Sequence, residues 1–266
     1  MRPIIKWNLW QRRWSIFWWC MGITAFVSLE LGVYSSIRSQ AAQLNQALER
    51  LPSSVRALMG GSTDPFSPVG YLNSRLFYLL LPLLLSVLAI GLGSSLIARE
   101  ESNGTIELLL SRPISRGKLL ISKALAGLLV MAVVVIVSTL SILGLVKLVN
   151  IDVPLAYVAF AALMASLLAL VSGALAFAMC ALGNAGRGAS IGIACLVGLG
   201  GYIVSSLEAS VHWLSWPAKA LPYHYYNPIN VLRGSYTWGV AAMFLGIIAV
   251  LGAISWLAFR RRDISG

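Results

Sequence analysis

Residues that carry catalysis and metal binding are scarce in this chain of 266 residues. It has nine acidic residues, two histidines and three cysteines. Cys20, Cys180 and Cys195 all lie within apolar runs, at spacings that suit neither a zinc site nor a disulfide framework. The pattern G-x-x-x-x-G-K-[ST] of a phosphate loop is also missing. These absences argue against a zinc protein and a disulfide-rich domain, and they exclude a P-loop ATPase.

Charged residues of either sign are rare, and apolar residues dominate. Charged residues make up 11% and hydrophobic residues 58%, with a mean hydropathy of +0.82, whereas soluble domains carry about a quarter charged residues. This balance is typical of a membrane protein. The net charge of +11 does not require a nucleic acid partner, and we expect none, because membrane proteins gather basic residues beside their spans.

Six apolar stretches are long enough to cross the hydrocarbon core, which takes about 20 helical residues. Each should be helical, because a single span in lipid can satisfy its backbone only within itself. We therefore predict an all-α, multi-pass membrane protein with one transmembrane domain over residues 1–266. The predicted spans cover about 15–34, 76–98, 119–143, 155–182, 189–207 and 237–259, with 36–75 as an extracytoplasmic loop and 99–118 as a cytoplasmic loop.

The distribution of basic residues predicts the orientation. If both termini are inside, most of the twenty lysines and arginines lie on the cytoplasmic side. Arg260, Arg261 and Arg262 directly follow the last span and anchor it there. Because cytoplasmic loops carry an excess of Lys and Arg, both termini are predicted to be cytoplasmic, in a cell membrane of the bacterial type.

Two aromatic segments each allow two interpretations. Before the first span, Trp7 and Trp10 alternate with basic residues, which predicts an amphipathic helix in the headgroup zone; an ordinary basic flank is the alternative. The segment 208–234 is favoured as an aromatic belt at the membrane surface, and a re-entrant element is the alternative. Its three prolines argue against one continuous helix there.

Two features could indicate chemistry within the spans. Ser190 lies in a G-x-S-x-G pattern, as in an intramembrane serine protease, but the only histidines, His212 and His224, are predicted to lie on the other side. A close helix contact through Gly188 and Gly192 is the preferred interpretation. Lys123 is near the end of its span and is expected to extend to the interface. So few charges in the spans argue against an ion-coupled carrier or a pump with its own chain of titratable groups, so the energy should come from elsewhere.

The loop 99–118 is a charged island between apolar runs. Gly104 permits a turn, Thr105 can cap a helix that begins at Ile106, and Pro113 ends it. Such a short amphipathic helix suits docking in a groove on a soluble partner. An interfacial loop whose leucines rest on lipid fits these residues equally well.

A family resemblance favours the docking helix. Phe66-Ser67-Pro68-Val69-Gly70-Tyr71-Leu72, Leu81-Pro82-Leu83, Tyr226-Asn227-Pro228 and the run over 100–116 resemble the ABC-2 type permeases, membrane subunits of ATP-binding-cassette exporters. The resemblance covers nearly the whole chain. The long loop after the first span departs from the better-studied branch of this family, so we infer no substrate site from the resemblance.

The resemblance implies an exporter permease that pairs with a second copy or a related permease, and that binds two cytoplasmic ATPase subunits. No cofactor is expected in this chain, since ATP and Mg²⁺ would be held by the ATPases, and the permease would not be an enzyme. The substrate would be amphipathic, lipid-like, a drug or a peptide. A membrane scaffold that recruits a cytoplasmic partner without transport is the alternative. The residues implied in coupling to the ATPase are Glu100, Glu101, Gly104, Thr105, Glu107, Arg112 and Arg116.

Overall fold

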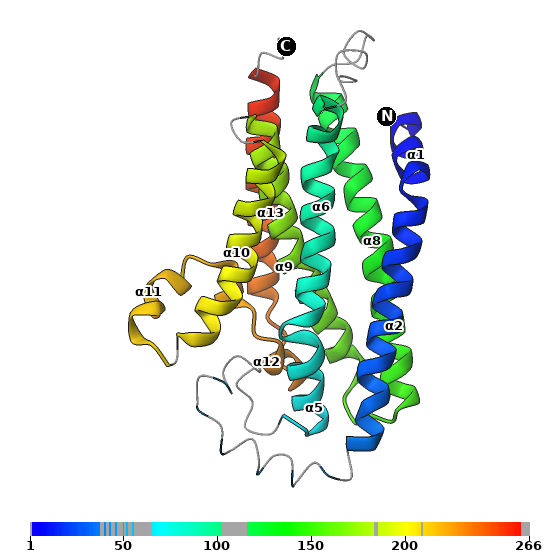
Figure 1. The fold of residues 1–266 in the computed structure, drawn as a ribbon, viewed down its shortest axis with the longest axis vertical. Helices are drawn as coiled ribbons and strands as arrows, with labels where there is room; N and C mark the ends of the chain where they lie inside the picture. Colours follow the sequence, from blue (N-terminus) through cyan, green and yellow to red (C-terminus); the bar gives the residue numbers. More distant parts are fainter. Residues whose placement is uncertain are drawn as a thin grey trace.

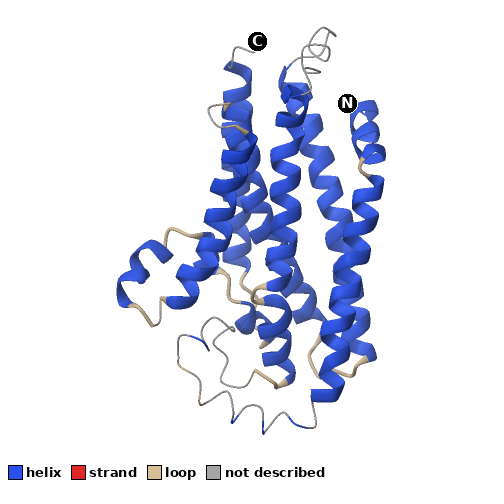
Figure 2. Ribbon diagram, viewed as in Figure 1, coloured by secondary structure: helices blue, strands red, loops and turns tan. Residues whose placement is uncertain are grey.

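A computed structural model describes residues 2–37, 65–102, 116–183, 186–208 and 210–261, and the single positions 40, 43, 46, 50, 52 and 55 (Figure 1). All regular structure within these residues is helical (Figure 2), which confirms the predicted fold class. The long helices are α2 (Arg13–Ile37), α6 (Leu80–Ser102), α8 (Arg116–Leu148), α9 (Leu155–Leu182), α10 (Arg187–Leu207) and α13 (Trp238–Arg261). The short helices are α1 (Arg2–Gln11), α5 (Pro68–Tyr71), the π-helix η2 (Leu72–Phe77), η3 (His212–Leu214), α11 (Ser215–Ala218), η4 (Pro222–Tyr225) and α12 (Pro228–Leu232).

Six helical segments of the described chain are long and apolar enough to cross a membrane, as predicted. Two differ in extent from the prediction. The second spans Pro68–Leu96, so it begins about two turns before residue 76, and the third spans Gly117–Leu148, beyond residue 143. The early start has a local cause: the Ser67 side chain accepts a hydrogen bond from the Gly70 amide, and Pro68 occupies the first helical turn.

The long helices stand side by side in one bundle, and α1 begins at the same end at which α13 finishes (Figure 1). We call this the termini end. The C-terminal end of α6 and the beginning of α8 lie there too. The first turns of α6 and the end of α10 lie in the other half, towards what we call the opposite end.

Helix α9 is the centre of the bundle and contacts α6, α8, α10 and α13. Its residues Ala161, Ala165 and Ala169 are fully buried, and with Gly173 they recur every four residues, so they lie along one side of the helix. Small side chains allow two helix backbones to approach closely, which is how helices associate in lipid.

The closest approach joins α9 to α6. A Cβ atom added to Gly93 would lie 2.3 Å from the Gly173 carbonyl oxygen, and one added to Gly173 would lie 2.8 Å from the Ala89 carbonyl oxygen. The predicted contact through Gly188 and Gly192 is not made within the described part of this chain, because a Cβ at either position has no neighbour within 4 Å, so it stays a prediction for a contact with another chain. The small-residue contact observed within the chain lies between α6 and α9.

Helix α1 leads into α2 with only a local irregularity at Arg12. The Arg12 amide donates to the Asn8 carbonyl at 3.2 Å, and the Arg12 carbonyl accepts from the Ile16 amide at 2.9 Å. Trp7 and Trp10 are exposed and stacked at 5.9 Å between ring centroids. The predicted helix is therefore present with its tryptophans outward, and its placement in the headgroup zone stays a prediction.

Beyond α10 the chain turns back on itself. The residues His212–Tyr225, which we call the fold-back segment, lie beside α10 rather than beyond its end (Figure 1). A Cβ on Gly201 of α10 would lie 3.3 Å from the Tyr223 Cβ atom. Trp213 and Trp216 are exposed, as an aromatic belt requires, and whether the segment enters the membrane as a re-entrant element stays a prediction.

Candidate functional site

The predicted coupling loop joins α6 to α8 at the termini end. Glu100 and Glu101 lie in the last turn of α6, and Arg116 is the first residue of α8. The other predicted coupling residues, Gly104, Thr105, Glu107 and Arg112, lie outside the described residues, and so does the predicted docking helix. The structure thus places the two ends of the loop in the bundle.

The base of this loop is held by packing among four helices. Leu96 of α6, Leu120 of α8, Phe177 of α9 and Phe259 of α13 are buried in one cluster. Trp256 packs against the same cluster, and its Nε1 atom lies 2.9 Å from where a Cβ on Gly117 would be. A force applied to the loop would therefore be received by α6, α8, α9 and α13 together.

Two basic side chains add polar contacts at the same level. The Lys123 ammonium donates a hydrogen bond to the Leu96 carbonyl at 2.9 Å, and Arg12 Nη2 donates to Ser95 Oγ at 2.8 Å. Lys123 is only 3% exposed, so the prediction that it extends to the interface is wrong. The lysine instead joins α8 to α6 beneath the loop, because a carbonyl on the neighbouring helix is within its reach.

Replacing Lys123 by methionine is expected to loosen this junction. Methionine is unbranched and only one atom shorter than lysine, and it removes the charged donor; a hydrogen bond to a charged group contributes about 1.5–3 kcal/mol. The melting temperature of the detergent-solubilised protein should therefore fall. The matched control is Lys118→Met, since Lys118 lies on the same helix and is exposed. Equal melting temperatures for the two variants would contradict the role of Lys123.

A cavity of about 230 Å³ lies between α6, α9, α10 and the fold-back segment. Its lining is almost entirely apolar, and Ser86, Ser172 and Cys195 are among its few polar side chains. Leu79 and Tyr223 border the cavity on the side of the opposite end, and Ile90 of α6 borders it on the side of the termini end. The cavity therefore occupies the middle and the opposite half of the bundle, away from the loop.

Next to this cavity the second span contains a break. The π-helix η2 ends at Phe77, and α6 begins at Leu80. Pro82 has no amide hydrogen, so the Tyr78 carbonyl four residues earlier receives no bond from it. The Tyr223 hydroxyl donates to this carbonyl, and the Tyr226 hydroxyl donates to the Phe77 carbonyl at 2.7 Å.

The burial of the two tyrosines suits them to donate these hydrogen bonds. Tyr223 and Tyr226 are 6% and 4% exposed, and their rings pack edge to face at 5.6 Å between centroids. Burial raises the pKa of both hydroxyls above the usual range, so both stay protonated and able to donate. Sequence reasoning assigned these tyrosines to an aromatic belt and missed their role; the proline within an apolar run at Leu81-Pro82-Leu83 was the available signal.

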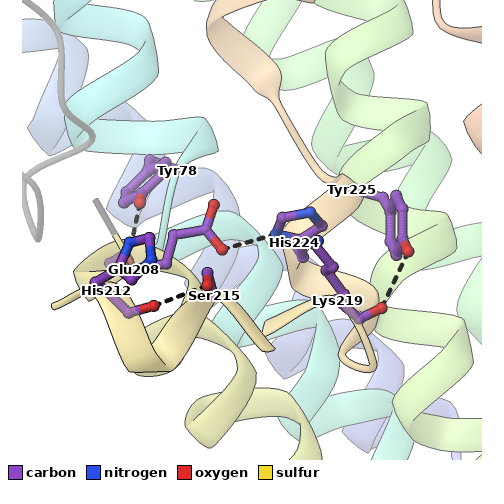
Figure 3. A network of polar contacts seen from close by, with 8 residues as sticks. Tyr78, Glu208, His212, Ser215, Lys219, His224 and Tyr225 are labelled. Atoms are coloured by element: carbon purple, nitrogen blue, oxygen red, sulfur yellow. Dashed lines mark hydrogen bonds and ion pairs between the residues drawn. The ribbon is translucent and has the colours of Figure 1, made fainter. Parts of the chain in front are cut away.

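Further polar contacts fix the fold-back segment (Figure 3). His224 Nδ1 lies 2.8 Å from Glu208 Oε2 at the end of α10, and the Tyr225 hydroxyl donates to the Lys219 carbonyl at 3.0 Å. Close by, the hydroxyls of Tyr78 and Ser206 join the second span to α10 at 2.8 Å. The segment is thus tied to α10 at one side and to the second span at the other.

The arrangement does not support a serine protease. The Ser190 hydroxyl is buried and donates to the Gly186 carbonyl at 3.3 Å, in the first turn of α10. Both histidines belong to the fold-back segment, and His224 pairs with Glu208 beyond the last turn of α10. A general base must lie within hydrogen-bond reach of the serine, and neither histidine does.

The fold and these sites define a multi-pass helical membrane protein. Four of its helices pack together beside the ends of the loop 99–118, and an apolar cavity lies towards the opposite end. A family model described as ABC-2 family transporter protein matches residues 9–264, and the chain belongs to this family. No curated protein sequence matches the chain significantly. The protein is therefore a membrane component of an ABC transporter, and permeases of its family normally work with a cytoplasmic ABC ATPase.

Proposed function

We propose that this chain is the permease subunit of an ATP-driven exporter in the cell membrane, with the termini end in the cytoplasm. The observation that carries the proposal is the position of the two ends of the loop 99–118, the last turn of α6 and the first turn of α8, which lie at the termini end next to a base packed from four helices. Together with the family match, this arrangement supports a role as the receiver of force from an ATPase.

The mechanism assigns the chemistry to separate subunits. Two cytoplasmic ATPases hold ATP and Mg²⁺, and their closure displaces the coupling loop. Glu100, Glu101 and Arg116 at its ends, and the residues between them, transmit this displacement to α6 and α8. The permease breaks no covalent bond itself. It alternates between states that open the cavity to one side of the membrane or to the other.

A second permease chain completes the pathway in this proposal. Large apolar side chains of α8 and α13, such as Ile136, Leu140 and Val250, are exposed in the single chain. Lipid covers part of this surface, and a second copy or a related permease covers another part. The almost uncharged cavity suits an amphipathic, lipid-like, drug or peptide substrate.

The experiment that tests the proposal is purification of the tagged protein from its native membrane. An ATPase with a phosphate loop is expected to copurify, and its hydrolysis should rise when amphipathic candidate substrates are added to the reconstituted complex. The control is a preparation from which the permease has been omitted. Copurification of a partner without a phosphate loop would contradict the exporter and favour the scaffold.

A further inference from the structure

The break in the second span separates the π-helix η2 from the α-helix α6. Between Pro82 and Ser102 the helix α6 is continuous, and the Leu83 amide donates to the Leu79 carbonyl at 2.9 Å. On the other side of the break, the Tyr78 amide donates to the Asn73 carbonyl in the wider π-helical pattern. Helices bend at π-bulges and at prolines, so the segment 77–82 is where this span can bend.

The carbonyl groups at the break are held from outside the span. Tyr78 and Phe77 each accept a hydrogen bond from the fold-back segment or from the residue directly after it, through the hydroxyls of Tyr223 and Tyr226. We call Tyr223 and Tyr226 the tyrosine pair. The fold-back segment is also held to α10 through Glu208 and His224 at 2.8 Å. It therefore bridges the second span and α10, both of which border the cavity.

Resting on the proposed function, we propose that the tyrosine pair are positioning residues of the transport cycle, which couple Phe77 and Tyr78, directly before α6, to the fold-back segment. The coupling loop is attached to the other end of the same helix. A displacement of the loop therefore moves α6 as a whole. Because the tyrosine pair holds the two carbonyl groups at the break, the fold-back segment follows this movement and the span does not simply bend at the break. Since Pro222 and Tyr223 line the cavity, its wall moves with the helix.

The position of Cys195 allows this coupling to be measured. Cys195 is exposed and lines the cavity, whereas Cys20 and Cys180 lie on other helices. A variant with Cys20→Ala and Cys180→Ala keeps Cys195 as its only thiol. In proteoliposomes that contain the complex with its ATPase, a membrane-impermeant maleimide is added on the side away from the ATPase. Its rate of reaction with Cys195 reports how open the cavity wall is.

Tyr226→Phe in this parent is expected to raise the nucleotide-free labelling rate by about two- to tenfold, which is the factor that one net hydrogen bond contributes. The difference between the nucleotide-free state and the state with ATP and vanadate should shrink. The matched control is Tyr225→Phe, because the hydroxyl of Tyr225 bonds the Lys219 carbonyl and not the second span. Basal ATP hydrolysis should agree between the two variants, and the melting temperature of Tyr226→Phe should fall by no more than the loss of one hydrogen bond explains, which separates positioning from loss of structure.

A second pair of variants tests the bond at Tyr78. Pro82→Ala supplies an amide hydrogen opposite the Tyr78 carbonyl, so the Tyr223 hydroxyl loses its special role. Pro82→Ala and Tyr223→Phe act on the same carbonyl, so the double variant should label no faster than the faster single variant. Additive effects of the two changes would overturn this assignment.

The results distinguish the inference from the proposed function. If nucleotide has no effect on Cys195 labelling in the parent, the proposed coupling to an ATPase is wrong. If Tyr226→Phe labels at the rate of Tyr225→Phe without nucleotide, the tyrosine pair does not position the wall of the cavity, whatever the ATPase does.

Discussion

Gly93→Val is expected to prevent the bundle from forming. Its first side-chain carbon would lie 2.3 Å from the Gly173 carbonyl oxygen, in a contact between two helix backbones that no rotamer change can relieve. Overpacking of a core costs about 1–3 kcal/mol where side chains can move, and here α6 must separate from α9. We expect a cost at or above the top of that range, and loss of the monodisperse peak in size-exclusion chromatography of the solubilised protein.

Gly91→Val provides the matched control on the same helix. A Cβ at Gly91 meets no atom within 4 Å, and the residue is exposed. The same substitution two residues away should therefore leave the yield and the melting temperature close to those of the wild type. If Gly93→Val gave a monodisperse protein as stable as Gly91→Val, the close approach of α6 and α9 would be contradicted.

Glu107→Arg is expected to abolish substrate-stimulated ATP hydrolysis while leaving insertion into the membrane intact. Glu107 lies in the proposed docking helix of the coupling loop, and a reversed charge in a matched interface costs several kcal/mol. That penalty corresponds to a loss of coupling of about a hundredfold or more. The measurement is ATP hydrolysis by the reconstituted complex with and without an amphipathic substrate.

The control for the charge reversal is Asp152→Arg. Asp152 is exposed in the turn between α8 and α9, at the opposite end, and the substitution makes the same change in charge. Stimulated hydrolysis should be retained in this variant. Unchanged stimulation in Glu107→Arg would show that the coupling residues have been assigned to the wrong loop.

The six spans were predictable because hydropathy and helix length are properties of the sequence alone. The start of the second span was not, because polar residues in η2 lower the local hydropathy, and Asn73 is nevertheless buried in the bundle. Small-residue spacing also failed to identify the helix contact. Ala89 and Gly93 have the same spacing as Gly188 and Gly192, and only tertiary packing decides which pair meets a neighbour.

The candidate site also was predictable only in part from the sequence. The sequence placed the loop to which we assign coupling between the second and third spans, because its charges interrupt two apolar runs. It did not show that Lys123 bonds the Leu96 carbonyl, since a lysine near the end of a span can extend either way. It also left the path of 212–225 open between an aromatic belt and a re-entrant element, because that path depends on the Tyr78 carbonyl, which Pro82 leaves without an amide partner.

The central place of α9 constrains how the protein is made. Helix α6 packs mainly on α9, and α2 packs mainly on α8. Of the long helices in the described chain, α9 is the fourth to leave the ribosome. Until translation passes Leu182, α6 therefore rests in the membrane with its glycine face against lipid, and assembly of the bundle waits for a helix from the second half of the chain.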